Sequence, residues 1–306
     1  MDSMRRVIFA VILITLAYVG VLWSQQALNP ALPAGAVAPS PDDGTVWVCP
    51  MDPDVRSSTP GVCPRCGMKL ASGLPEPTEY HMDVALTPRN IQPESPMNMV
   101  FSIFDPWKGR PVTKYQVVHE KLFHMFVVGQ DLTYFLHDHP VFHPDGTFHY
   151  DNLVVPKPGM YRVIGDFYPD GATPQLIAKT LVVPGEAPAP VKLTRDYAAK
   201  DPANLHVEFS TVPEQPIAGM TTQLHFHLSP AEGIEKYLAA WGHMLVASDD
   251  LIDLIHTHPF IADGGPDVQF NVVLPRPDHY YRIWVQFQRD GVVNTAQFDV
   301  KSEDLH

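Results

Sequence analysis

The chain has 306 residues, of which 45% are hydrophobic, so it holds enough apolar material for two medium domains and a small one. Its formal net charge of -13 argues against binding of nucleic acid, which needs clustered Lys and Arg, and weakens any interpretation based on anionic membrane surfaces. The 32 Pro disfavour long helices, and three Cys, an odd number, exclude a fully paired disulfide framework.

The first predicted element is an apolar segment, residues 1–25, in which Arg5 and Arg6 precede an uncharged run from Val7 to Trp23. The run is close to the shortest length that spans a membrane as a helix, and basic residues before it favour an inside N-terminus. We therefore expect a transmembrane anchor, with the body of the chain facing the periplasm or the extracellular side. A cleaved signal peptide is the alternative and gives the same location. A Pro- and Ala-rich linker, residues 26–45, follows.

Residues 46–72 form a predicted metal-binding module that contains all three cysteines. Cys63 and Cys66 make a Cys-x-x-Cys pair, which directs two sulfurs toward one point across a tight turn. Thiolate together with thioether is the ligand set that selects Cu(I) and similar soft ions. The expected ligands of the module are Cys49, Met51, Cys63, Cys66 and Met68.

Two other interpretations of the cysteines remain open. One is a structural zinc knuckle, so zinc stands beside copper as a candidate ion, but a knuckle needs a fourth ligand such as His81. The other is a disulfide between Cys63 and Cys66, which an oxidising compartment permits. His81 and Met82 follow the module closely and are further candidates to complete its site.

The string C-P-M-x-P-x-V, followed by P-G-x-C-P-x-C-G-M-x-L, resembles the heavy-metal-binding domain at the N-terminus of copper- and silver-efflux ATPases and efflux-pump adaptor proteins. The resemblance implies a copper- or silver-like ion at Cys49, Cys63 and Cys66. That family usually has His where this chain has Asp52, so the ligand set differs at this position. Adaptors resemble long helical hairpins between β domains, and this chain has no apolar heptads of useful length, so a complete adaptor is not expected.

A tandem repeat follows the module. The strings LFHMFVVGQDLTYFLHDHP (122–140) and WGHMLVASDDLIDLIHTHP (241–259) align at a constant shift of 119 positions. Farther on, PGMYRVIGDFYPDG (158–171) resembles DHYYRIWVQFQRDG (278–291). We therefore expect a duplicated domain.

Short strands at regular spacing, separated by turn signals, predict two tandem β-sandwiches, immunoglobulin-like or cupredoxin-like, at 79–186 and 203–301. The Pro- and Ala-rich segment Pro184 to Pro202 joins them. One short piece, Ile234 to Ala240, looks helical. The fold class is therefore mainly β, with an N-terminal membrane helix and a small Cys-rich module. The repeats also look like uncharacterised exported β domains that often accompany metal-efflux proteins. Alternation predicts one strand face made of Tyr281, Ile283, Val285 and Phe287.

Each repeat carries three histidines at matching positions. His137 and His139 point to the same face of a strand, and a hairpin can bring His124 opposite them. A three-His site suits Cu(II) or Zn(II). The alternative is a structural network in which the imidazoles hydrogen-bond backbone groups. Met125 and Met244 are expected in the core, with the histidines before them outside it. The candidate ligands are His124, His137, His139, His243, His256 and His258. Further histidines are His119, His143, His149, His225 and His227.

Together these patterns predict an exported, membrane-tethered binding protein for a copper-like heavy-metal ion in metal resistance or trafficking. Its partners are the metal ion and an efflux-system protein. Metal affinity is expected to fall below about pH 6, because thiolate and imidazole ligands take up protons. The alternative is a periplasmic scaffold whose sandwiches recruit a partner and whose cysteine module is structural. No Ser-His-Asp order, HExxH, P-loop or dinucleotide fingerprint is present, so we expect no enzyme; copper redox chemistry at the histidines is the enzymatic alternative left open.

Overall fold

The computed structural model describes residues 36–37, 47–49, 55–57, 59–64, 67, 69–72, 79–106, 109–170 and 172–305. All regular elements within this part are β-strands, and none of its segments forms a helix able to cross a membrane. The expected membrane segment, residues 1–25, and most of the linker lie outside it. The chain divides into two compact units, Met1–Ala36 and Val37–His306, and both repeats belong to the second unit.

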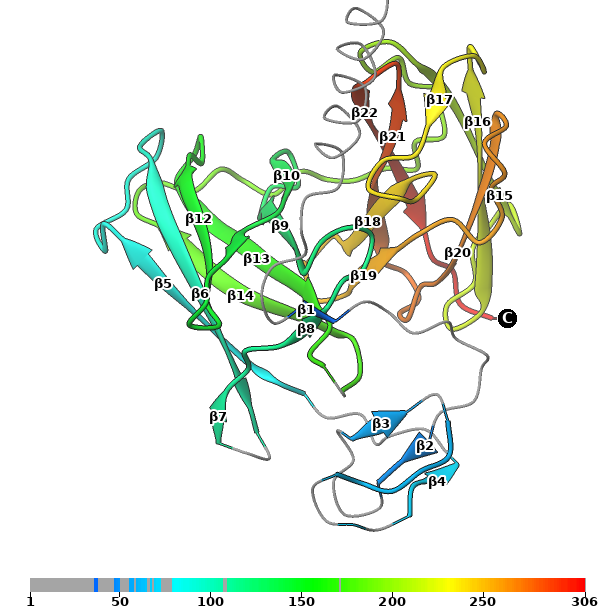
Figure 1. Cartoon of the computed structure of the whole chain (residues 1–306). Helices are drawn as coiled ribbons and strands as arrows, with labels where there is room; N and C mark the ends of the chain where they lie inside the picture. Colours follow the sequence, from blue (N-terminus) through cyan, green and yellow to red (C-terminus); the bar gives the residue numbers. More distant parts are fainter. Residues whose placement is uncertain are drawn as a thin grey trace, which may run out of the picture. The chain divides into compact units, whose positions relative to one another are not determined.

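The cysteine module is a small antiparallel sheet with the strand order β3-β2-β4 (Figure 1). The expected tight turn after Cys63 is present, because Gly67 donates its N–H to the Cys63 carbonyl at 2.8 Å. Gly67 has a φ of 75°, which glycine adopts without a steric penalty. The strands up to this point are β1 (Ala36–Val37), β2 (Trp47–Val48), β3 (Arg56–Ser57) and β4 (Ala71–Ser72).

The first repeat is a sandwich of two antiparallel sheets, β11-β12-β6-β5, with β7 on β6, and β10-β9-β13-β14. Inward side chains alternate along β6, where Met97 and Met99 are buried in the core. The Phe123 ring, from the other sheet, lies 5.1 Å from the Phe101 ring, so both sheets share this core. The strands are β5 (His81–Thr87), β6 (Met97–Asp105), β7 (Arg110–Pro111), β8 (Tyr115–Gln116), β9 (Phe123–Gly129), β10 (Phe135–Asp138), β11 (Val141–Phe142), β12 (Phe148–Leu153), β13 (Gly159–Phe167) and β14 (Gln175–Val183).

The second repeat has the same plan, with sheets β15-β16-β20 and β17-β21-β18-β19, and β22 on β21. Its β18, β19, β21 and β22 correspond to β9, β10, β13 and β14 of the first repeat, as a duplication requires. The strands are β15 (His206–Val212), β16 (Thr221–Ser229), β17 (Ile234–Glu235), β18 (His243–Ser248), β19 (Leu254–Thr257), β20 (Asp267–Val273), β21 (Tyr280–Arg289) and β22 (Val292–Lys301).

One local expectation was wrong. The piece from Ile234 to Ala240 is not helical: it starts with β17 and ends in a turn where Leu238 and Ala239 have φ values of 50° and 61°, which a right-handed helix excludes. The segment that joins the repeats, Pro184 to Pro202, also packs on the rest of the chain. Its Leu193 is buried in an apolar cluster, and Asp196 pairs with the backbone of Asp299 on β22.

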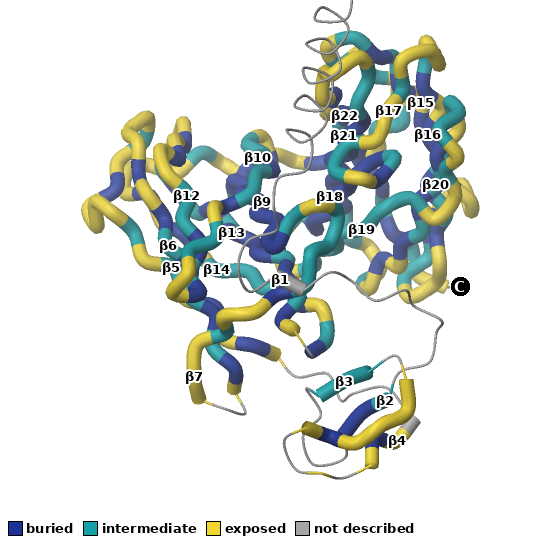
Figure 2. The backbone as a smooth tube through the Cα atoms, in the orientation of Figure 1, coloured by how far each residue is buried: buried dark blue, intermediate teal, exposed yellow. Residues whose placement is uncertain are grey.

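Strand β21 is buried on both faces, which the alternation alone did not predict. The expected face, which includes Tyr281 and Ile283, lies in the core of the second sandwich. The opposite face carries Trp284, which stacks on Phe135 of the first repeat with ring centroids 5.1 Å apart. An apolar cluster lies between the β9 sheet and the β18 sheet. It contains residues from both repeats, including Phe126 and Trp284. The dark blue of β9 and β18 in Figure 2 marks this burial.

Arg282 links the two repeats and yields a prediction. Its Nε and Nη2 donate to both carboxylate oxygens of Asp299 at 2.8 Å, and its Nη1 donates to the Leu132 carbonyl of the first repeat at 2.7 Å. Arg282→Met leaves the buried Asp299 charge uncompensated, so the free energy of unfolding in denaturant should fall by about 3–5 kcal/mol. The partly exposed Arg195, beside Glu303, is the control, and Arg195→Met should cost less than about 1 kcal/mol. Equal losses would contradict the linking role.

Candidate metal centres

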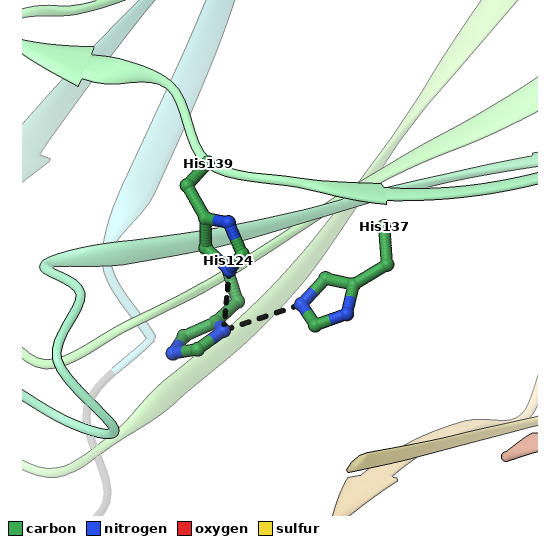
Figure 3. A group of neighbouring side chains, drawn as sticks. All are labelled: His124, His137 and His139. Atoms are coloured by element: carbon green, nitrogen blue, oxygen red, sulfur yellow. Dashed lines mark hydrogen bonds between the residues drawn. The ribbon is translucent and has the colours of Figure 1, made fainter. Parts of the chain in front are cut away.

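The β9–β10 hairpin brings together the first histidine triad, His124, His137 and His139 (Figure 3). His137 pairs with Phe126 across the hairpin, and the same register carries His139 toward His124. The Nδ1 of His124 lies 3.3 Å from Nε2 of His137 and 3.1 Å from Nε2 of His139. One nitrogen from each ring lies within 4.8 Å of the others. The hairpin therefore produces the three-nitrogen cluster that the spacing predicted.

The β18–β19 hairpin brings together the second triad, His243, His256 and His258, in the same way. The Nε2 of His258 lies 3.0 Å from Nδ1 of His243, and one nitrogen from each of the three rings again lies within 4.8 Å of the others. Duplication has therefore preserved the side-chain arrangement as well as the strands.

Hydrogen bonds to backbone carbonyls determine which nitrogen carries the proton in the first histidine of each triad. The Nε2 of His124 donates to the Val118 carbonyl at 3.0 Å, and the Nε2 of His243 donates to the Tyr237 carbonyl at 2.9 Å. A carbonyl oxygen can only accept, so Nδ1 of both rings is unprotonated and points into its triad. Metal-binding histidines are commonly oriented by such a bond on the far side of the ring.

His256 gives the clearest sign that the second triad fits a cation. Its Nδ1 donates to the Asp166 carboxylate, so in the neutral ring its Nε2 carries a lone pair. This Nε2 is buried and has no hydrogen-bond partner among the described residues. Leaving a buried acceptor unsatisfied costs roughly 1–3 kcal/mol. A metal ion bound by the triad removes this cost.

His137 occupies the equivalent position in the first triad. Its Nδ1 donates to Oε1 of Gln286 at 2.7 Å, while the Gln286 amide nitrogen donates to Thr295 at 3.0 Å. The Nε2 of His137 is therefore unprotonated and faces the unprotonated Nδ1 of His124. The bonds to Val118 and Tyr237 also belong to the structural network that we considered as the alternative. In the first triad that network leaves the lone pairs of His124 and His137 facing each other, whereas a metal ion uses both.

Burial favours the neutral form of five of the six triad histidines. Desolvation, assisted by neighbouring histidines, lowers the pKa of His124 to about 4 and that of His137 to about 3. The pKa values of His139, His243 and His258 are lowered by the same two causes. Neutral imidazole is the form that binds metal.

His124 and His243 lie outside the sandwich cores, as expected, but both are nevertheless buried. The neighbouring Met125 and Met244 fill the sandwich cores, as expected. The reason is that the opposite repeat covers the histidine face of each sheet.

In the cysteine module, Cys49 and Cys63 are buried in one small cluster with Leu70. Gathering two thiols in one cluster fits a soft ion. Three other expected ligands, Met51, Cys66 and Met68, lie outside the described residues. Met82 cannot complete this site, because it is fully buried in the core of the first sandwich. His81 is exposed and lies 3.3 Å from Asp83.

Sequence reasoning missed Asp166 and Gln286, which touch the triads but have no local motif, and it named His119 only as a further histidine. The one available signal was that Asp166 and Gln286 align with each other in the repeats. Asp249, Asp250 and His279 form a third group of residue types that can bind metal. In this group Asp250 and His279 contact the guanidinium of Arg276, and Asp249 contacts His279.

A family model described as "Domain of unknown function (DUF8832)" matches residues 78–183 and 200–304, which together make up more than half of the chain. The chain belongs to the DUF8832 family. A second model, described as "Heavy metal binding domain", matches residues 46–71 and supports the resemblance of the cysteine module at that level. No curated protein matches the sequence.

Several solved structures resemble the DUF8832 protein weakly. The Escherichia coli adhesin FdeC is 12% identical, over 78% of this chain and 71% of that chain, with a TM-score of 0.25. The Yersinia pseudotuberculosis adhesin InvE is 13% identical, over 72% and 58%, with a TM-score of 0.22. The FN1-FN3 domains of chicken CNTN1 are 10% identical, over 67% and 60%, with a TM-score of 0.22. At these scores the likenesses carry no argument about function.

The neutral triads make the metal-free DUF8832 protein acid-sensitive. The unfolded chain protonates its histidines near pH 6.5, whereas the folded protein keeps His124 and His137 neutral down to about pH 4 and about pH 3. The unfolded state therefore binds more protons between these values, and stability falls as the pH drops below 6.5. We expect a loss on the order of 3 kcal/mol or more between pH 6.5 and 4.5, measured by denaturant titration. His149→Gln, outside the triads, should keep the same profile; a flat native profile would contradict the assignment.

Proposed function

We propose that the protein captures a copper-like heavy-metal ion and holds it for metal resistance or trafficking. The observation that carries this proposal is the convergence of three imidazole nitrogens in each triad, above all the unpartnered Nε2 of His256. The match to a heavy-metal-binding domain supports a second, sulfur-based site. Thiolates favour Cu(I), whereas imidazoles suit Cu(II) or Zn(II), so the chain offers sites to either oxidation state of copper.

The same proposal places the protein outside the cytoplasm. The support is the apolar run after Arg5 and Arg6, which acts as a membrane tether or export signal. An efflux-system protein is the partner to which the captured ion is passed. We propose binding, not catalysis, as the role, and oxygen consumption by the copper-loaded protein would argue against it.

Selective removal of each ligand class tests the function. The full chain is compared with a cysteine variant and a histidine variant. The cysteine variant carries Cys49→Ser, Cys63→Ser and Cys66→Ser, and the histidine variant carries His124→Gln and His243→Gln. Each protein is titrated with Cu(I) anaerobically and with Cu(II), against chelators of known affinity. We expect the cysteine variant to lose its tight Cu(I) site and keep Cu(II), and the histidine variant to do the reverse. Tenfold or larger losses are expected, since each removes at least one direct ligand. Native protein that binds neither ion would overturn the proposal.

Proton competition gives a second test. Cu(I) affinity at the cysteine module should fall below about pH 6, because thiolates take up protons. Cu(II) affinity at the triads should persist to lower pH, because burial has already lowered their histidine pKa values. The measurement is the same chelator competition at pH 8, 7, 6 and 5. A flat Cu(I) affinity over this range would contradict the thiolate assignment, and a Cu(II) affinity that falls in parallel with that of Cu(I) would contradict the triad assignment.

A scaffold is the second candidate function. It is favoured by the burial of Cys49 and Cys63 within a very small apolar cluster, the position that cysteines of a structural knuckle occupy. In this case the triads bind no copper, the triple serine variant loses all copper binding, and the module unfolds. Retention of Cu(II) by that variant separates the two functions.

A further inference from the structure

We infer that the two histidine triads are one dinuclear metal centre, assembled between the repeats. This inference rests on the proposed function, since it requires the triads to bind metal. It adds that the two ions lie close enough to interact and that each repeat supports the ion of the other.

The distances between histidine rings show that the two triads lie next to each other. The His124 ring lies 5.7 Å from the His243 ring and 5.5 Å from the His256 ring, and His137 lies 5.6 Å from His243. These distances join rings of different triads. Within the second triad, His243 lies 6.1 Å from His256. The other ring distances within the triads run from 4.6 to 5.5 Å, so histidines of different triads are nearly as close as histidines of one triad, and the six rings form a single cluster.

The second step is an exchange of hydrogen bonds between the repeats. Asp166 lies opposite His124 in its own sheet, but its carboxylate accepts a hydrogen bond from His256 of the second repeat. Gln286 lies opposite His243 in its own sheet, but its amide oxygen accepts a hydrogen bond from His137 of the first repeat. Each repeat thus orients a ligand in the other, so neither triad is complete without both repeats.

The two halves of the centre are not equivalent. His256 is supported by a carboxylate, which raises the basicity of the ligand, whereas His137 is supported by a neutral amide. The ring of His119 also lies over His258, with centroids 3.7 Å apart. The 119-position shift aligns His119 with Leu238, which has no ring to stack on a histidine. The second triad should therefore bind its ion more tightly and fill first.

The ligand type narrows the choice of ions. All six nitrogens come from imidazoles, and the sulfurs of Met125 and Met244 lie in the sandwich cores. Imidazole-only sites suit Cu(II) and Zn(II). We therefore choose Cu(II) as the probe, because its unpaired electron reports on a second copper nearby.

The test uses the full chain carrying Cys49→Ser, Cys63→Ser and Cys66→Ser, so that copper binds only elsewhere. Bound copper is counted by elemental analysis, and spins are counted by electron paramagnetic resonance. We expect two Cu(II) per chain, a half-field transition, and fewer detectable spins than bound copper. Adding His124→Gln should leave one Cu(II) with a single-ion spectrum and no half-field transition, and adding His243→Gln should do the same. His225→Gln, on the outer face of β16, is the matched control and should change nothing.

Each other outcome overturns the inference. Two Cu(II) with a full two-spin signal and no half-field transition means two independent sites. One Cu(II) per chain, lost in either histidine variant, means a single ion shared by both triads. No Cu(II) in the serine variant means that the triads do not bind it. If the serine variant binds no Cu(II) but the native chain binds copper, the dinuclear centre is rejected and the proposed function is retained. If neither protein binds copper, both are rejected. Circular dichroism and thermal unfolding confirm that each variant is folded.

The hydrogen bonds by which each repeat supports a histidine of the other can be tested separately. Asp166→Asn keeps the shape of the side chain but removes the charge that supports His256, so Cu(II) affinity at the second triad should fall 10- to 100-fold. The first triad should then fill earlier, which changes the single-ion spectrum at one equivalent of copper; Asp166→Glu should restore the native order. Asp267→Asn is the control, since Asp267 pairs with His227 at 2.8 Å on the outer face. An unchanged affinity and filling order in Asp166→Asn would overturn the cross-support.

Discussion

The packing of the β9 sheet of one repeat against the β18 sheet of the other is the interaction on which the rest depends. Ordinary sandwiches bury one face of each sheet, but here the outer faces of two sheets also cover each other. That contact removes water from His124, His243 and Arg282. Depressed histidine pKa values, the buried pairing of Arg282 with Asp299 and the meeting of the two triads all follow from it.

Much of the fold could be predicted because the duplication presents the same pattern of strands and turns twice. The constant shift between the repeats located the strands, and alternation at 280–287 identified the core face of β21. Alternation also places Arg282, Trp284 and Gln286 together on the opposite face, but it does not say what covers that face. Its burial depends on contacts between residues about 150 positions apart, such as Arg282 with Leu132, and local periodicity cannot report these.

The histidine triads were accessible to sequence reasoning for a related reason. Strand geometry alone places His137 and His139 on one face, and a hairpin turn brings His124 to them. Their supporting residues were not accessible, because Asp166 and Gln286 serve the triad of the other repeat and neither lies in a recognisable motif. The cysteine module was found by its spacing, and the heavy-metal-binding match covers the same segment. Its fold is local, so local sequence is sufficient to find it.

The exchange between Asp166 and Gln286 also bears on why the two domains are fused. Two identical chains that met through this face would carry the same side chain at both supporting positions, either two acids or two amides. In a single polypeptide the two supporting positions need not carry the same side chain, because each repeat can mutate independently of the other. One gene therefore encodes a pair of unlike pockets from one ancestral pattern, with a charged support on one side and a neutral support on the other.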